Sequence, residues 1–173
     1  MSTNNNRLIF HGTLAFGATL WLGLLFGVSF LATPVKFAAP TLTLPVGLDV
    51  GRVTFALFNK VEWAMAALVA IVFLFAGMRR ISLVLLAASI GILGLQQFWL
   101  RPILDVRIAA AIAGTPMPQT YHHVAYVAFE VAKAVSLLGL AILTFRHLIQ
   151  LSKRTSIATT LSGSASRANC ERV

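Results

Sequence analysis

Residues 121–133 form an apolar stretch, YHHVAYVAFEVAK, that contains an unusual number of ionisable side chains. These side chains are His122, His123, Glu130 and Lys133. An ionised side chain at the centre of a membrane-spanning helix is disfavoured by about 2.5–3.5 kcal/mol, so such residues are expected to face other protein groups. Histidine and carboxylate groups exchange protons, and carboxylates also pair with lysine. The stretch therefore predicts a charge-pairing or a proton-binding site.

Two other stretches supply polar side chains that could meet this one. GRVTFALFNKVEW contains Asn59, Lys60 and Glu62, and a later apolar run ends with Gln96 and Gln97. The predicted polar cluster within the membrane consists of Asn59, Lys60, Glu62, Gln96, Gln97, His122, His123, Tyr126, Glu130 and Lys133. At helical spacing His122, Tyr126, Glu130 and Lys133 lie on one stripe, as do Asn59 and Glu62.

Two uses of this cluster are open. In the first, Glu62 pairs with Lys133 and Lys60 pairs with Glu130, which holds two helices together. In the second, Glu62, Glu130 and His122 form a protonatable or ligand-binding pocket, as in a small proton-coupled or solute carrier.

A third interpretation is a metal- or haem-binding redox protein. Adjacent His122 and His123 diverge by about 100° on a helix, so they cannot share one ion without another helix. A bis-histidine haem between His11 and His147 would lie at the edge of the bundle. We therefore expect no cofactor and no metal site. The sequence has no G-x-S-x-G, phosphate-loop or H-E-x-x-H motif, so no catalytic residue and no enzyme activity are predicted.

The elements that position these residues are predicted to be membrane-spanning helices. The chain has 173 residues, of which 58% are hydrophobic and only 11% charged, whereas charged residues make up about a quarter of a globular domain. The prediction is an all-α, four-helix transmembrane domain over residues 1–151, with spans at about 13–33, 58–78, 81–100 and 126–146. Residues 152–173 are predicted to form a disordered basic tail.

Span length places the ionisable residues inside the membrane. About 20 apolar residues cross a bilayer core, but the charge-free part of the last span, residues 134–145, supplies about 18 Å. The span must therefore include Glu130 and Lys133. Pro34, Pro40 and Pro45 are expected to interrupt the helix between the first two spans, and Pro102 to end or kink the third.

Glycine and basic residues predict contacts and orientation. Gly23 and Gly27 are in G-x-x-x-G spacing, which favours close helix packing, either within the chain or with a homo-oligomer or another membrane protein. With four spans, eight lysines and arginines lie on the side of both termini and four on the other side. The positive-inside rule then predicts cytoplasmic termini. Because the basic residues flank apolar runs, a nucleic-acid partner is not expected.

The order of parts resembles a known family. The segments LWLGLLFGVSFLATPVKF, GRVTFALFNKVEW and HHVAYVAFEVAK open or close successive spans. The chain is similar, from about His11 to His147, to bacterial four-span proteins that resemble the transmembrane protein 205 family. The resemblance implies a small polytopic protein and supplies no catalytic residues. The expected function is that of a non-enzymatic accessory or assembly component, multi-pass in the bacterial inner (plasma) membrane.

Overall fold

A computed structural model describes residues 2–77, 79–115, 117, 118 and 120–170, with side chains placed between residues 6 and 154. The helices are α1 (Ser2–Leu25), α2 (Thr33–Lys36), α3 (Leu44–Ala76), α4 (Arg80–Leu95), α5 (Arg101–Ile112) and α6 (His122–Cys170). Two π-helical segments, η1 (Phe26–Ala32) and η2 (Gln96–Leu100), join α1 to α2 and α4 to α5. The described residues are helical apart from short connections, and they contain no strand.

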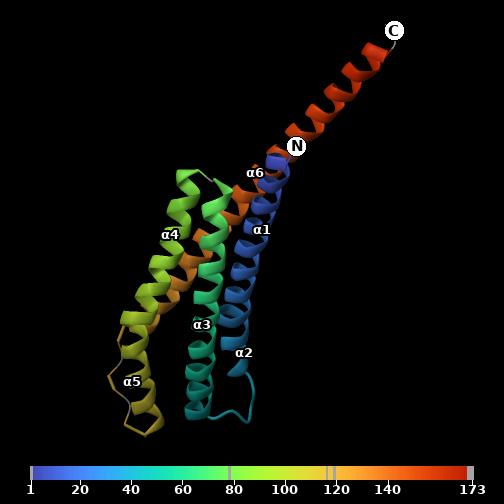
Figure 1. The fold of residues 1–173 in the computed structure, drawn as a ribbon. Helices are drawn as coiled ribbons and strands as arrows, with labels where there is room; N and C mark the ends of the chain where they lie inside the picture. The colour runs from blue at the N-terminus through green and yellow to red at the C-terminus, as the bar shows by residue number, and fades with distance from the viewer. Residues whose placement is uncertain (1, 78, 116, 119, 171–173) are drawn as a thin grey trace.

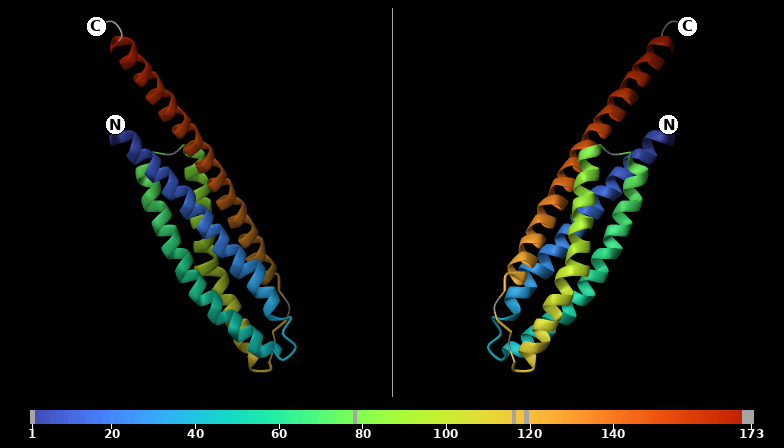
Figure 2. Two further views of the ribbon diagram at one scale, coloured as in Figure 1. Left: turned by 90° about the vertical axis from the view of Figure 1, so that its right-hand side faces the viewer. Right: turned by 90° about the vertical axis from the view of Figure 1, so that its left-hand side faces the viewer.

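The helices form one bundle with two distinct ends (Figure 1). Around the bundle, α3 packs against α1, α1 against α6 and α6 against α4. Both α4 and α5 also contact α3, which closes the bundle. The end with the start of α1 and the α3–α4 turn is called the terminal end. The end with the α2–α3 and α5–α6 connections is called the loop end. The last part of α6 extends beyond the bundle at the terminal end (Figure 2).

Polarity is reversed between the surface and the interior of the bundle. Large apolar side chains face outward, and Leu74 and Phe98 are 79% and 76% exposed. Glu62 and Lys133 are buried, with exposed fractions of 1% and 0%. Among the described residues, four helical stretches are long and apolar enough to cross a membrane. They are Asn6–Lys36, Leu44–Ala76, Arg80–Ile112 and His122–Arg154. The predicted all-α class with four such helices is therefore confirmed.

The helices extend past the limits predicted for them. Pro45 lies in the first turn of α3, where its missing N–H would have no helical partner, so α3 begins at Leu44 and contains most of the span predicted at about 58–78. The third helix continues past Pro102 to Ile112. The backbone of α6 is helical to Cys170, so it includes most of the segment for which the sequence predicts a disordered tail. The tail contains no proline, and extending a formed helix avoids the unfavourable nucleation step.

Both π-helical segments end two residues before a proline. The N–H of Thr33 binds the carbonyl of Val28, and the N–H of Arg101 binds that of Gln96, so each bond spans five residues. Pro34 and Pro102 lack an N–H and collide with the carbonyl four residues earlier, and the wider turn relieves that conflict. At Pro34 and Pro102 the local pitch of the helix thus changes. The predicted interruption between the first two spans is confirmed, because residues 37–43 are not helical.

Close packing uses glycines other than the predicted pair. A Cβ at Gly23 or Gly27 would meet nothing within 4 Å, so packing of this pair within the chain is wrong. Between the long helices the tight glycines are Gly17, whose Cβ would lie 3.2 Å from Val69, and Gly139, whose Cβ would lie 3.2 Å from Leu85. A small residue at these two sites lets α1 approach α3 and α6 approach α4.

Gly77 ends α3 in the left-handed region, with φ of 61°. We predict that Gly77→Ala lowers the free energy of unfolding by about 1 kcal/mol, because a Cβ is disfavoured at positive φ. Gly91→Ala is the matched control, since Gly91 is helical and its Cβ would meet nothing within 4 Å. Unfolding titrations in mixed micelles measure both variants, and an equal effect of the two would contradict the prediction.

Candidate functional site

A network of buried ionisable and polar groups lies where the four long helical stretches meet. Its centre is the Nζ of Lys133, which lies 2.7 Å from Glu62 Oε1, 3.1 Å from Glu130 Oε1 and 2.9 Å from Gln96 Oε1. An ammonium group has three N–H donors, and here each has a partner. The structure therefore contains the predicted ion pair between Glu62 and Lys133.

The two carboxylates accept further hydrogen bonds from neutral groups. Trp21 Nε1 donates to Glu62 Oε1 over 3.1 Å. Gln96 Nε2 donates to Glu130 Oε1 over 2.8 Å, and the hydroxyl of Ser29 donates to Glu130 Oε2 over 2.9 Å. These six residues, Trp21, Ser29, Glu62, Gln96, Glu130 and Lys133, are called the central cluster.

The fold brings the central cluster together from every side of the bundle. Trp21 comes from α1, Glu62 from α3, and Glu130 and Lys133 from successive turns of α6. Ser29 and Gln96 come from η1 and η2, so each proline-linked π turn delivers one polar side chain to Glu130. π turns within α-helices are frequent at functional sites.

Six of the predicted cluster residues lie outside the central cluster, and Lys60 and Gln97 are the first two of them. Lys60 is exposed, and Glu130 is bonded to Lys133, Gln96 and Ser29, so the predicted pair between Lys60 and Glu130 is wrong. Lys60 is two residues from Glu62, about 200° around the helix, and therefore faces away from the bundle axis. Gln97 accepts a hydrogen bond from Arg101 over 2.9 Å, on a different side from Gln96.

The two histidines are at the beginning of α6. The Nδ1 of His122 lies 2.8 Å from the hydroxyl of Thr120, and His123 is exposed. Neither reaches the central cluster, because both stand two turns before Glu130 on the helix.

Asn59 and Tyr126 are buried beside the central cluster. Asn59 is 3% exposed, and its Nδ2 has no hydrogen-bond partner among the described residues. Tyr126 is 8% exposed and packs edge-on against Phe55, with ring centroids 5.7 Å apart.

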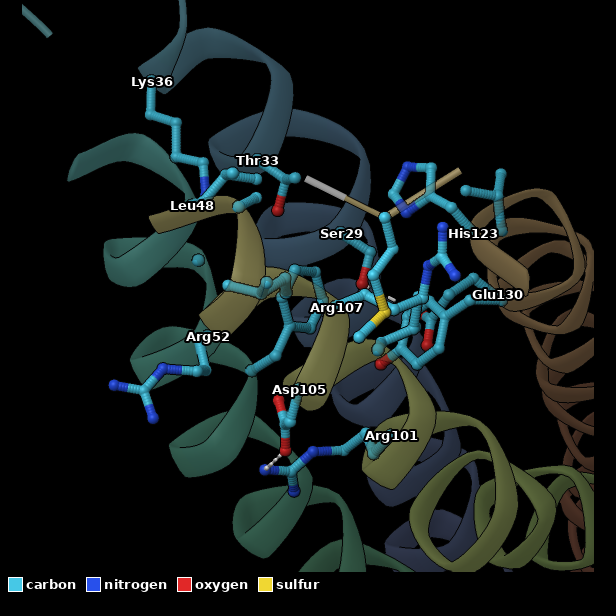
Figure 3. A pocket seen from close by; sticks show the side chains of 18 residues that line it. Ser29, Thr33, Lys36, Leu48, Arg52, Arg101, Asp105, Arg107, His123 and Glu130 are labelled. Carbon is cyan, nitrogen blue, oxygen red and sulfur yellow. Dashed lines mark hydrogen bonds and ion pairs between the residues drawn. The ribbon is translucent and has the colours of Figure 1, made fainter. Parts of the chain in front are cut away.

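A cavity of about 380 Å³ lies at the loop end, directly beside the central cluster. Figure 3 shows its lining side chains, which come from η1 and α2, from α3, from α5 and from the start of α6. Ser29 and Glu130 belong both to this cavity and to the central cluster. The loop-end cavity therefore gives access to one carboxylate of the network.

The remaining lining of the loop-end cavity combines apolar walls with basic groups. The walls include Phe55, Leu104, Ile108, Ala111 and Val127, and Tyr126 adds a phenol. The basic groups are Lys36, Arg52, Arg101, Arg107 and the predicted site residue His123. Arg52 is bound to Asp49 at 2.7 Å, and Arg101 lies 3.8 Å from Asp105. A volume in this range, with apolar walls and a few polar groups, is typical of a small-molecule site.

His11 and His147 meet at the terminal end. Their ring centroids are 4.8 Å apart, and His11 Nδ1 lies 2.7 Å from the carbonyl oxygen of Arg7. Rings in direct contact leave no space for a porphyrin between them, so the haem arrangement considered from the sequence does not fit this geometry. Among the described residues, no group of three or more histidine, cysteine, aspartate or glutamate side chains is placed to hold a metal ion.

Sequence reasoning missed Trp21 and Ser29. Both stand alone in the apolar first span, and neither carries a charge that would mark it. Their hydrogen-bond donors could have identified them, because a tryptophan N–H or a serine hydroxyl in the middle of a spanning helix needs an acceptor.

Comparison with protein-family models, with curated proteins and with solved structures gave no match to this chain.

Proposed function

We propose that the chain is a non-enzymatic, multi-pass protein of the bacterial inner membrane with cytoplasmic termini. The four long apolar helices and their outward apolar side chains support insertion in a bilayer. The excess of basic residues at the terminal end supports the orientation. In this orientation the loop-end cavity opens toward the outer side.

The charge of the central cluster supports proton binding. It contains two carboxyl groups, Glu62 and Glu130, but one ammonium group, Lys133. An uncompensated charge in a buried site costs several kcal/mol, and protonation of one carboxyl group removes it. The other groups that bond to the two carboxyl groups are Trp21, Gln96 and Ser29, which are neutral and therefore leave one of the two negative charges without a positive partner. We infer that the cluster holds one proton at neutral pH.

The functional proposal rests on Glu130, which belongs both to the central cluster and to the lining of the loop-end cavity. Its carboxyl group is fixed by the central cluster and also lines the loop-end cavity. A solute that enters the cavity contacts the group that shares the proton, so binding and protonation are linked. The proposed function is therefore a proton-linked solute-binding protein acting as a small carrier. The resemblance to four-span proteins similar to the transmembrane protein 205 family stays a prediction.

Glu130→Gln is expected to uncouple solute binding from protonation. In weakly buffered detergent solution, a panel of small organic acids, amines and sugars is added to the purified protein. A solute that binds raises the midpoint temperature of thermal unfolding of the wild type. The same solute is expected to change the proton concentration of the solution in proportion to the amount of solute bound. Glu130→Gln should lose at least about 90% of that proton exchange, because it removes the carboxyl group that the cavity shares with the central cluster. Lys60→Gln removes an exposed charge outside the cavity and should behave as the wild type.

Ala111→Trp separates binding in the cavity from the stability of the central cluster. Ala111 lines the loop-end cavity but makes no contact in the central cluster, so an indole there fills the cavity and should abolish solute binding. If no solute stabilises the wild type, or if Glu130→Gln retains full proton exchange, the carrier proposal fails. The central cluster would then serve only to hold the helices of an accessory or assembly component.

A further inference from the structure

A second pocket lies at the terminal end of the bundle, far from the loop-end cavity along the helices. It has a volume of about 390 Å³ and is formed by the beginning of α4 and by residues 143–150 of α6. Arg79, Arg146, His147 and Gln150 supply its polar lining, and Ser82 is buried at its base at 1% exposure. The proposed function makes no use of this terminal pocket.

The two arginines of the terminal pocket have no carboxylate partner in the described part of the chain. The described acidic residues are Asp49, Glu62, Asp105 and Glu130, and all of them belong to the central cluster or to the loop-end half. The terminal end instead carries several further arginines and lysines. Two guanidinium groups beside one pocket therefore present hydrogen-bond donors and positive charge to an anion that the described residues do not supply.

The position of the pocket identifies the kind of anion. Ile81 and Ile149 line it and are 53% and 52% exposed, and the exposed apolar side chains of Val84, Ile142 and Phe145 follow along α4 and α6 toward the middle of the bundle. The beginning of α4 adds the positive end of a helix dipole. A ligand that fits has an anionic head beside the arginines and apolar chains along the two helices.

We propose that the terminal pocket binds the headgroup of an anionic phospholipid. The phosphate oxygens accept hydrogen bonds from Arg79 and Arg146, and guanidinium groups bind phosphate in a paired geometry. Basic pockets between spanning helices on the cytoplasmic side are suited to such headgroups. The acyl chains occupy the apolar surface that α4 and α6 expose to the bilayer.

Native mass spectrometry of the full chain with added lipids tests this assignment. Phosphatidylglycerol is expected to remain bound to the wild type, while phosphatidylcholine, which has no net charge, is not retained. The double variant Arg79→Gln/Arg146→Gln should weaken phosphatidylglycerol binding by at least about tenfold, from about 1 kcal/mol per basic residue. The matched control, Arg80→Gln/Lys153→Gln, removes the same charge from the same end but outside the pocket.

The controls distinguish lipid binding in the terminal pocket from nonspecific electrostatic attraction of anionic lipid to the basic end. They also distinguish binding of a lipid from binding of free phosphate. An affinity loss in the Arg80→Gln/Lys153→Gln control equal to that in the pocket variant would overturn the proposal. Inorganic phosphate that displaces the lipid completely at millimolar concentration would overturn the lipid source. Because all four substituted side chains are exposed, equal thermal midpoints of the two double variants are expected and exclude unfolding as the cause.

Discussion

Lys133→Met is expected to lower the free energy of unfolding by about 3–5 kcal/mol, the range seen when one partner of a buried ion pair is removed. Lys133 is fully buried and lies within hydrogen-bonding distance of Glu62, Gln96 and Glu130. Without its ammonium group, two carboxyl groups share one buried site, and both must bind a proton or repel each other. Unfolding titrations in mixed micelles measure the loss.

Two further variants show whether this loss comes from charge. Lys60→Met removes an exposed lysine from α3 and should change stability by less than about 0.5 kcal/mol. The double variant Lys133→Met/Glu62→Gln should be more stable than the sum of the single effects predicts, because it leaves one carboxyl group that protonation neutralises. Additive effects would mean that Glu62 and Lys133 do not act as a pair.

Trp21→Ala is expected to lower the free energy of unfolding by about 3–5 kcal/mol, as is usual when a buried tryptophan is truncated. Trp21 is fully buried in the core between α1 and its neighbours, and its Nε1 donates to Glu62. The substitution removes both a large packed surface and a donor to a buried carboxylate. The same unfolding titration measures this variant.

Trp21→Phe divides the loss into its two parts. It retains most of the ring but removes the N–H donor to a charged group, a bond worth about 1.5–3 kcal/mol. Trp99→Ala is the matched control, since Trp99 is 52% exposed and belongs to the outer surface of η2. If Trp21→Phe is as stable as the wild type, the bond to Glu62 does not contribute to stability.

Much of the fold followed from the sequence because apolar length is a strong signal. The runs around Leu14, Val69, Leu86 and Leu137 are long enough to predict four helices, and each contributes to the core. Their limits were underestimated, because Pro45 and Pro102 were treated as helix ends. The N–H groups in the first turn of a helix have no partner within the helix. A proline in that turn therefore costs no hydrogen bond, and the helix can include it.

The candidate site was predictable where a charge marks a residue. The pair of Glu62 and Lys133 could be derived, because both charges fall inside spans that are too short without them. Lys60 was wrongly paired because only the sign of its charge was considered and not the side of the helix that it faces. Residues two apart on a helix, such as Lys60 and Glu62, face nearly opposite sides. Ser29 and Gln96 reach Glu130 through π turns, and the helical repeat of 3.6 residues does not predict such a local change of pitch.

Infrared spectroscopy of the carboxyl groups tests the central claim most directly, that the central cluster holds one proton at neutral pH. The account predicts a C=O stretching band of a protonated carboxyl group in the wild type, and loss of this band in both Glu62→Gln and Glu130→Gln. Each substitution leaves one carboxylate opposite Lys133, so the charges balance without a proton. Absence of the band in the wild type, or its persistence in both variants, would contradict the account.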